Sequence, residues 1–337
     1  MKMGKKHYGA IDGLRTIAAL GIVMMHIQAN TSYKISGYLY ERMIPEFTNF
    51  VFLFMVISAF GMCCGYYEKV LNNEISISEF YKRRFLKTLP FFGILVIIDL
   101  LMSPSVDSFA QAFADLTLLF GFLPNAGDIE VIGVGWSLGL VFVFYLCFPF
   151  FCFLIETKKR AWFSFFISLI YNFVCANYFE IDRRNILYSA CFFLAGGLLY
   201  LYRDEISKTN KFAVLAGVWL TVILYYIIGG NTITLLLVSV LLLMYATLAS
   251  KGVLQNKVTK FLSGISMEIY LSHMLMFRVV EKTGLHTVLG DGWIQYIVTV
   301  VLVFIGTVIF SFVMKCMIER VEGKLVGRST TGRKIGR

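Results

Sequence analysis

The sequence predicts an all-α fold, a polytopic bundle of about ten transmembrane helices, and three observations support this prediction. Hydrophobic residues make up 58% of the 337-residue chain and charged residues only 15%, whereas a soluble protein carries about 25% charged residues. The mean hydropathy is +0.73, and apolar runs of roughly 20 residues, the length that crosses a bilayer, recur along the chain. The lysines and arginines are concentrated in alternate connecting segments. These features leave no room for a sizeable soluble domain.

Ten segments are apolar enough to be predicted as membrane spans, and we expect the first to be retained rather than cleaved as a signal peptide. The predicted spans are 10–29, 47–67, 85–103, 134–155, 161–178, 186–202, 211–229, 231–249, 261–280 and 293–317. Segment 109–124, FAQAFADLTLLFGFLP, is shorter and more polar. We therefore expect a re-entrant or interfacial helix there.

The distribution of basic residues predicts the orientation of the chain. With the N-terminus in the cytoplasm, the predicted cytoplasmic segments hold 24 of the 31 lysines and arginines. Loop 104–130, predicted on the outer side, contains neither lysine nor arginine. This bias favours an even number of spans with both termini cytoplasmic, including a basic tail at 326–337. The net charge of +10 is then explained by topology, without a nucleic-acid partner.

The seven cysteines contain no C-x-x-C pair and lie in or beside apolar runs. Such positions are typical of packing residues. We therefore expect neither disulfides nor a metal site.

The first predicted span, IDGLRTIAALGIVMMH, carries three ionisable residues, Asp12, Arg15 and His26. A charge at the centre of a membrane helix costs roughly 2.5–3.5 kcal/mol on insertion scales, so such residues usually face a cavity or a partner. Arg15 and His26 project from one helical face about 16 Å apart, and Asp12 lies on the same stripe, where we expect it to pair with Arg15. In the alternative interpretation, Arg15 and His26 only extend to the two membrane interfaces.

Three further segments place polar residues on one helical face. FYKRRFLKTLP brings Arg83, Arg84 and Lys87 within about one turn, which suits phosphate binding, although the same residues would serve as a topological anchor. SGISMEIYLSHM aligns Ser266, Tyr270 and His273, for binding or for interhelical hydrogen bonds. GWSLGLVFVFYLCFPF places Trp136 and Ser137 at the outer end of a span, with Tyr145 two turns further in; an interfacial belt residue is the alternative for Trp136.

Five segments, in order, resemble motifs of the bacterial acyltransferase-3 family of multi-pass membrane O-acyltransferases. DGLR followed by R-x10-H matches Arg15 and His26, and FMVISAFGM is similar to FFxxSGF, with Ala59 in place of a glycine. FYKRRFLKTLP is similar to RRxxRxxP, with Lys87 at the second basic position. GWSLGLVFVFY resembles WSLxxExxFY, and ISMEIYLSHM resembles ISYxxYLxH. The resemblance runs along nearly the whole chain, and it assigns residues 1–325 to a membrane acyltransferase domain.

One position departs from the family pattern. Where many members carry a glutamate after WSL, this chain has Val141, on the same helical stripe as Ser137 and Tyr145. If that glutamate orients the catalytic histidine or the acceptor, this protein acts without it.

The resemblance implies transfer of an acyl group, most often acetyl, from cytoplasmic acyl-CoA to a hydroxyl of an extracytoplasmic glycan, by an enzyme of the bacterial plasma membrane. Acyl-CoA is then a donor substrate, and no tightly bound cofactor is expected. Arg83, Arg84 and Lys87, with Arg15, are expected to hold the CoA phosphates. His26 is expected to act as general base or to accept the acyl group itself. The expected substrate-binding residues are Asp12, Ser58, Trp136, Tyr145, Ser266, Tyr270 and His273.

Two other classes of function fit the same polar columns. A transporter or flippase for a lipid-linked saccharide would use them as a solute path, but no inverted repeat is visible. A non-catalytic scaffold of a surface-polymer assembly complex is the other alternative, and Val141 is its best argument. The sequence does not predict the oligomeric state.

Overall fold

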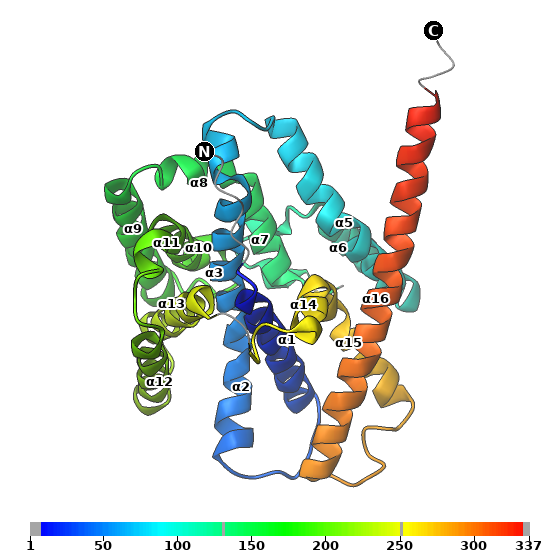
Figure 1. Ribbon diagram of the computed structural model, residues 1–337. Helices are drawn as coiled ribbons and strands as arrows, with labels where there is room; N and C mark the ends of the chain where they lie inside the picture. Colours follow the sequence, from blue (N-terminus) through cyan, green and yellow to red (C-terminus); the bar gives the residue numbers. More distant parts are fainter. Residues whose placement is uncertain (1–7, 130–131, 250–251, 333–337) are drawn as a thin grey trace.

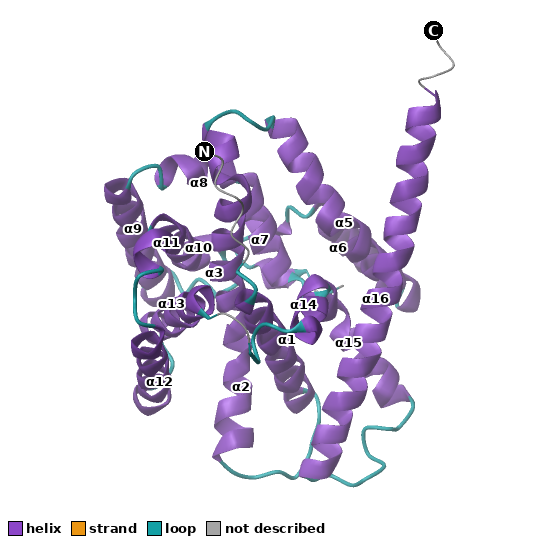
Figure 2. Ribbon diagram, viewed as in Figure 1, coloured by secondary structure: helices purple, strands orange, loops and turns teal. Residues whose placement is uncertain are grey.

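The computed structural model describes residues 8–129, 132–249 and 252–332, and for 323–332 only the course of the helix. Every regular element in these residues is a helix, and one isolated bridge joins Gly252 to Gln255. The predicted all-α class is confirmed (Figure 2).

The first third of the chain forms long helices. Helix α1 (Ala10–Ala29) is followed by one continuous helical rod, Leu39–Leu71, which contains α2 (Ile44–Glu46), α3 (Phe50–Met62) and α4 (Glu68–Leu71). Helix α5 (Ile77–Met102) begins where the Ser76 side chain accepts a hydrogen bond from the Glu79 amide. That bond satisfies one of the free donors of the first turn.

Shorter helices follow in the middle of the chain. Helix α6 (Val106–Thr117) ends at Leu118, whose φ of 58° is left-handed and stops the helix. Helices α7 (Trp136–Leu146) and α8 (Phe148–Leu154) meet at an angle of 66°. The bend coincides with Pro149, in the first turn of α8, because proline cannot continue the hydrogen bonding of a preceding helix. The next elements are α9 (Lys158–Asn177), α10 (Ile186–Leu201), α11 (Arg203–Ile206), α12 (Lys211–Ile228) and α13 (Thr232–Leu248).

The last third contains α14 (Lys257–Gly264), α15 (Ser266–Lys282) and the 40-residue α16 (Trp293–Gly332). The predicted boundary between domain and tail at 325/326 therefore lies inside α16. Residues 333–337 of the predicted tail lie outside the described part of the chain.

The ten predicted spans all fall on helices, but ten crossings are not confirmed. In the described part of the chain, five helices are long and apolar enough to cross a membrane, and the bent pair α7–α8 makes a sixth if it counts as one span. Helices α10 and α13 are apolar but shorter, and α9 and α15 belong to neither group. The segment predicted at 109–124 begins earlier, as the 12-residue α6, which at about 18 Å is too short to cross. Its interfacial or re-entrant position stays a prediction.

Helix α1 lies at the centre of the bundle and packs against α3, α13, α14, α15 and α16, while α10 packs against α3 and α9 (Figure 1). The contact between α10 and α3 requires a glycine, because a Cβ on Gly196 would lie 2.3 Å from the Val56 carbonyl oxygen. On the other side of α10, Phe193 stacks on Phe144 of α7 with 4.4 Å between ring centroids. These contacts place α1, α3, α7 and α15 around a common interior.

The loops sort to two ends of the molecule. The α1–α2 and α15–α16 connections lie at one end in Figure 1, joined by the Lys34–Asp291 ion pair at 2.8 Å. The α4–α5 turn and the end of α16 lie at the other. The loops of the first pair, both predicted on the outer side, thus lie together at one end, and which end faces the cytoplasm stays a prediction.

Candidate functional site

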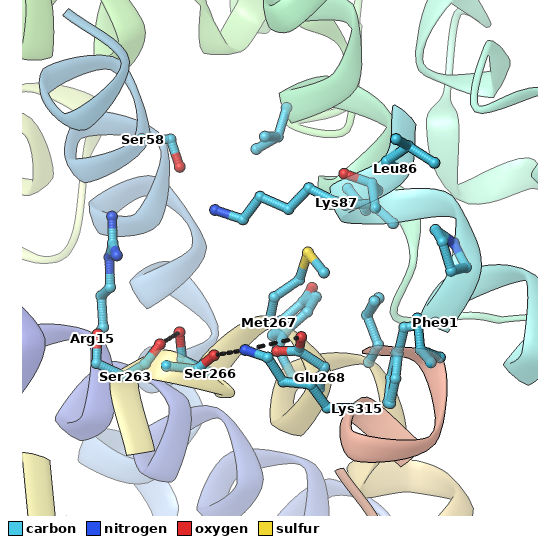
Figure 3. Close-up of a pocket in the computed structure, with 18 of the residues that line it drawn as sticks. Arg15, Ser58, Leu86, Lys87, Phe91, Ser263, Ser266, Met267, Glu268 and Lys315 are labelled. Carbon is cyan, nitrogen blue, oxygen red and sulfur yellow. Dashed lines mark hydrogen bonds and ion pairs between the residues drawn. The ribbon is translucent and has the colours of Figure 1, made fainter. Parts of the chain in front are cut away.

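A cavity of about 340 Å³ lies between α5, α7, α15 and α16, with α1 and α3 along one side (Figure 3). It gathers six of the residues predicted from sequence to bind substrate or cofactor: Arg15, Ser58, Lys87, Tyr145, Ser266 and Tyr270. Ser137 and Val141 also line it, so the α7 stripe predicted from sequence faces the cavity. A glutamate at position 141 would therefore have placed its carboxylate here.

The cavity contains two cations with no protein partner. In the described part of the chain, neither the Arg15 guanidinium nor the Lys87 ammonium forms a hydrogen bond or an ion pair. Figure 3 shows Lys87 extending across the cavity toward the side that holds Arg15 and Ser58. Arg15 is half-buried and Lys87 is exposed toward the cavity, and two cations without a partner make this part of the cavity suited to an anionic ligand.

The opposite edge of the cavity carries charges that the sequence analysis did not single out. Lys315 of α16 donates a hydrogen bond of 2.5 Å to the Gly264 carbonyl and lies 3.9 Å from the Glu268 carboxylate. Glu319 and Glu322, one and two turns further along α16, also line the cavity. The available signal was an acid inside the apolar run ISMEIYLSHM and a lysine near the end of the last span.

The wall of the cavity nearest α7 is closed by a hydrogen-bonded tyrosine. The Tyr270 hydroxyl donates to the Val134 carbonyl at 2.8 Å and accepts from the Ser137 hydroxyl at 2.9 Å. Helix α7 begins beside these atoms, so its first turn and α15 are joined at this point. Tyr270 lines the cavity, whereas His26 and His273 do not.

Two imidazoles lie together beyond Tyr270. The ring of His273 is 6.1 Å from the Tyr270 ring and 4.9 Å from the ring of His26, centroid to centroid. His273 is buried, and its Nδ1 lies 2.7 Å from the Tyr270 carbonyl oxygen, to which it donates as the neutral tautomer. Its Nε2 is then a lone-pair acceptor, and it is buried without a hydrogen-bond partner. His26 therefore has a second base as its neighbour.

Arg15 and His26 lie on one helix, and each contacts the interior. Arg15 enters the cavity, while His26 packs on α15. The predicted pairing of Asp12 with Arg15 is wrong: no ion pair joins them among the described residues, and Asp12 Oδ1 accepts a 2.7 Å hydrogen bond from Ser263. The Ser263 hydroxyl of α14 binds the Asp12 carboxylate instead, and a prediction from the sequence of α1 alone could not include α14.

The other predicted residues lie around the cavity rather than in it. Arg84 donates to the Tyr66 hydroxyl at 2.7 Å, and its guanidinium lies 5.7 Å from the Tyr145 ring centroid. Arg83 is half-exposed and pairs with Glu79 at 2.7 Å. Trp136 is buried near the start of α7. Arg84 thus lies behind the cavity wall, and a phosphate-binding role for Arg83 stays a prediction.

Within the described residues, no cluster of three or more histidine, cysteine, aspartate or glutamate side chains is arranged to hold a metal ion. The side chains gathered at the site offer imidazole, hydroxyl and carboxylate groups and fixed positive charge.

Comparison with known proteins gives two matches. A family model described as an acyltransferase domain matches residues 8–316. An uncharacterized protein of Haemophilus influenzae is 26% identical, over 47% of this chain and 76% of that protein. No solved structure matches.

Proposed function

The chain belongs to the acyltransferase-3 family of membrane acyltransferases, and from that premise we propose that it moves an acyl group, in the first instance acetyl, from cytoplasmic acyl-CoA to a hydroxyl of an extracytoplasmic glycan. The observation that carries this proposal is the juxtaposition of an anion-binding cavity and an imidazole pair on the two sides of Tyr270.

The cavity is the donor site in this proposal. The pyrophosphate and phosphate groups of CoA bind the two free cations, Arg15 and Lys87, and Lys315 lies at the edge of the same cavity. Charge-assisted hydrogen bonds to phosphate are about twice as strong as neutral ones. The thioester end of the donor points toward Tyr270, because that wall separates the cavity from the histidines.

The histidine pair is the reaction centre. Neutral His26 removes the proton of the acceptor hydroxyl as its oxygen attacks the thioester carbonyl. The C–O bond forms, the C–S bond breaks, and the CoA thiolate leaves toward the cytoplasm and takes up a proton. In the proposed reaction, His26 turns to donate a hydrogen bond to His273 Nε2, whose lone pair has no partner among the described residues, and this bond fixes which nitrogen of His26 carries the lone pair.

The division into two sites accounts for the sidedness of the reaction. CoA does not cross a membrane, and the glycan lies outside, so donor and acceptor arrive from opposite sides. Arg15 and His26 lie on α1 about 16 Å apart along its axis, a distance that separates the two binding sites while the acyl group passes between them.

The test uses purified protein in liposomes with labelled acetyl-CoA outside and a soluble saccharide acceptor inside. We expect free CoA to appear outside and labelled ester inside, only when both substrates are present. A carrier of lipid-linked saccharide or a scaffold would release no CoA. Absence of CoA release with every acceptor, from well-folded protein, would therefore overturn the proposal.

A further inference from the structure

Two arginines from the α9–α10 connection converge on one indole ring outside the cavity. The guanidinium carbons of Arg183 and Arg184 each lie 5.9 Å from the centroid of the Trp136 ring. Both distances are within the range of a cation–π interaction. Ser137, the neighbour of Trp136, donates a hydrogen bond to the Tyr270 hydroxyl, and the Tyr270 ring lies 6.1 Å from that of His273. The arginine pair is thus linked through Trp136 and Tyr270 to the two histidines, in a connection predicted to face outward.

Arg183 is held by neutral groups only. Its Nη1 donates to Asn49 Oδ1 at 3.2 Å and its Nη2 to Thr48 Oγ1 at 2.9 Å. A guanidinium has five N–H donors, so three remain for a ligand. No ion pair of Arg183 occurs in the residues that the structure describes. Behind Asn49, the Glu46 carboxylate accepts hydrogen bonds from the Asn49 amide and the Tyr225 hydroxyl.

The Arg184 side chain packs against Gly127. A Cβ on Gly127 would come within 2.3 Å of Arg184 Nη1, so a larger residue at position 127 would displace the Arg184 side chain. Arg184 Nε is buried without a hydrogen-bond partner, and its nearest carboxylate oxygen, on half-exposed Asp182, is 3.9 Å away. The Arg184 side chain is therefore held in place, while its Nε–H donor has no hydrogen-bond partner among the described residues.

The backbone that carries both arginines is fixed. The Arg183 carbonyl accepts a hydrogen bond from Ser189, and the Arg184 carbonyl accepts one from the Ala126 amide at 3.0 Å. Asn185, the next residue, caps α10 by accepting from the Leu187 amide at 2.8 Å. The N-terminus of the 16-residue α10 therefore adds its partial positive charge beside the two guanidinium groups.

Two guanidinium groups on one indole repel each other, and nothing among their described contacts neutralises Arg183. An oxyanion between them would remove the repulsion and engage the unused donors. From this geometry we infer that the acceptor carries an oxyanion, a phosphate or a carboxylate, which Arg183 and Arg184 bind so that a neighbouring hydroxyl lies at His26. This inference rests on the proposed function and names the class of its acceptor: an anionic saccharide.

The kinetic test compares three acceptors of similar size: glucose 1-phosphate, glucuronate and neutral methyl glucoside. We expect the wild-type protein to acetylate an anionic sugar with a kcat/KM at least about tenfold above that for methyl glucoside. In Arg183→Gln/Arg184→Gln, this preference should fall about tenfold. Whether phosphate or carboxylate is the native group is decided by which anionic sugar is preferred.

Two control variants separate binding from folding. Arg42→Gln removes an exposed arginine on the predicted outer side and should keep the preference. Gly127→Ala displaces Arg184 without removing a charge and should lower the preference, whereas Gly65→Ala, with no atom near its Cβ, should not. Equal use of neutral and anionic sugars by the wild type would overturn the inference.

A binding measurement separates this inference from the proposed function. Calorimetric titration of glucose 1-phosphate into detergent-solubilised protein requires no turnover. If no acceptor is acetylated but the sugar phosphate binds and the double variant weakens it about tenfold, the acyl-transfer proposal fails and the anion site stands. If neither anionic sugar binds, the anion site is wrong even where methyl glucoside is acetylated.

Discussion

The cations of the inner cavity and those at Trp136 are held in different ways. Arg15 and Lys87 extend into open space without a protein partner, whereas Arg183 is held by two side chains and Arg184 lies over a glycine. A free side chain loses conformational entropy when it binds, and a fixed one has lost it already. In the proposed function, the cavity site therefore suits a soluble donor present at high concentration, and the Trp136 site suits selection among acceptors.

The largest effect should come from His26, the proposed general base at which the two substrates meet. We expect His26→Ala to lower acetyl transfer by about 10²- to 10⁴-fold, the usual contribution of a general base, without weakening acetyl-CoA binding. Labelled ester formation and acetyl-CoA titration measure the two quantities. His286→Gln, in the α15–α16 loop, is the matched control. An active His26→Ala protein would leave the inner and outer sites without a shared reaction centre.

The next effect concerns the donor side. Arg15→Gln and Lys87→Gln should each raise the KM for acetyl-CoA by roughly tenfold, because each removes a charge-assisted hydrogen bond to phosphate. The preference among acceptors should not change. Lys82→Gln, an exposed lysine on the same helix as Lys87, is the control. If the acceptor preference changed with the KM for acetyl-CoA, the two sites would not be separate.

A smaller effect is expected at the wall between the sites. Tyr270→Phe leaves the Val134 carbonyl and the Ser137 hydroxyl without their partner, and an unsatisfied buried polar group costs about 1–3 kcal/mol. Thermal unfolding in detergent should show the loss, and Tyr171→Phe, on the exposed side of α9, should not. Unchanged stability would mean that this wall is not held by the hydroxyl.

The smallest expected effect concerns a carboxyl group that is buried away from the cavity. Asp115 of α6 is 1% exposed, and its Oδ2 has no hydrogen-bond partner. Burial raises the pKa of this carboxyl to about 7, with a further contribution from Asp99. An unfolded aspartate has a pKa of about 3.9. The folded state thus holds its proton to higher pH, and stability falls as pH rises from about 4 to about 7.

Asp115→Asn removes this titration. The melting temperature of the variant relative to wild type should rise between pH 5 and pH 8, because only the wild type acquires a buried charge. Asp107→Asn, at an exposed position of the same helix, should show no such trend. Parallel melting curves across the pH range would contradict the raised pKa.

The helical fold was readable from hydropathy because each apolar run satisfies its own backbone hydrogen bonds. The number of crossings was not, since composition does not distinguish a helix that spans from one that packs. Ile186–Leu201 is as apolar as a span but has only 16 residues, most of them buried in the bundle. The bend at Pro149 divides another predicted span into two helices at 66°.

At the site, helical periodicity correctly predicted which residues of one helix lie on the same face. Ser137, Val141 and Tyr145 reach the same cavity, which local geometry is sufficient to specify. Contacts between different helices cannot be predicted from periodicity along one helix. Asp12 binds Ser263 instead of Arg15, and Lys315 approaches Glu268 from 47 residues further along the chain. Arg183 lies between two predicted spans, and its place beside Trp136 depends on how α7 and α10 pack.

The length of α16 has a consequence for the donor cavity. Forty residues of helix measure about 60 Å, roughly twice the hydrocarbon thickness of a bilayer. Its apolar part, residues 293–314, measures about 33 Å and adjusts its tilt to the thickness of the surrounding bilayer. Since Lys315 and Glu319 are carried by α16 and line the cavity edge, tilting moves that edge against α5. We therefore expect the affinity for the donor to depend on the acyl-chain length of the host membrane.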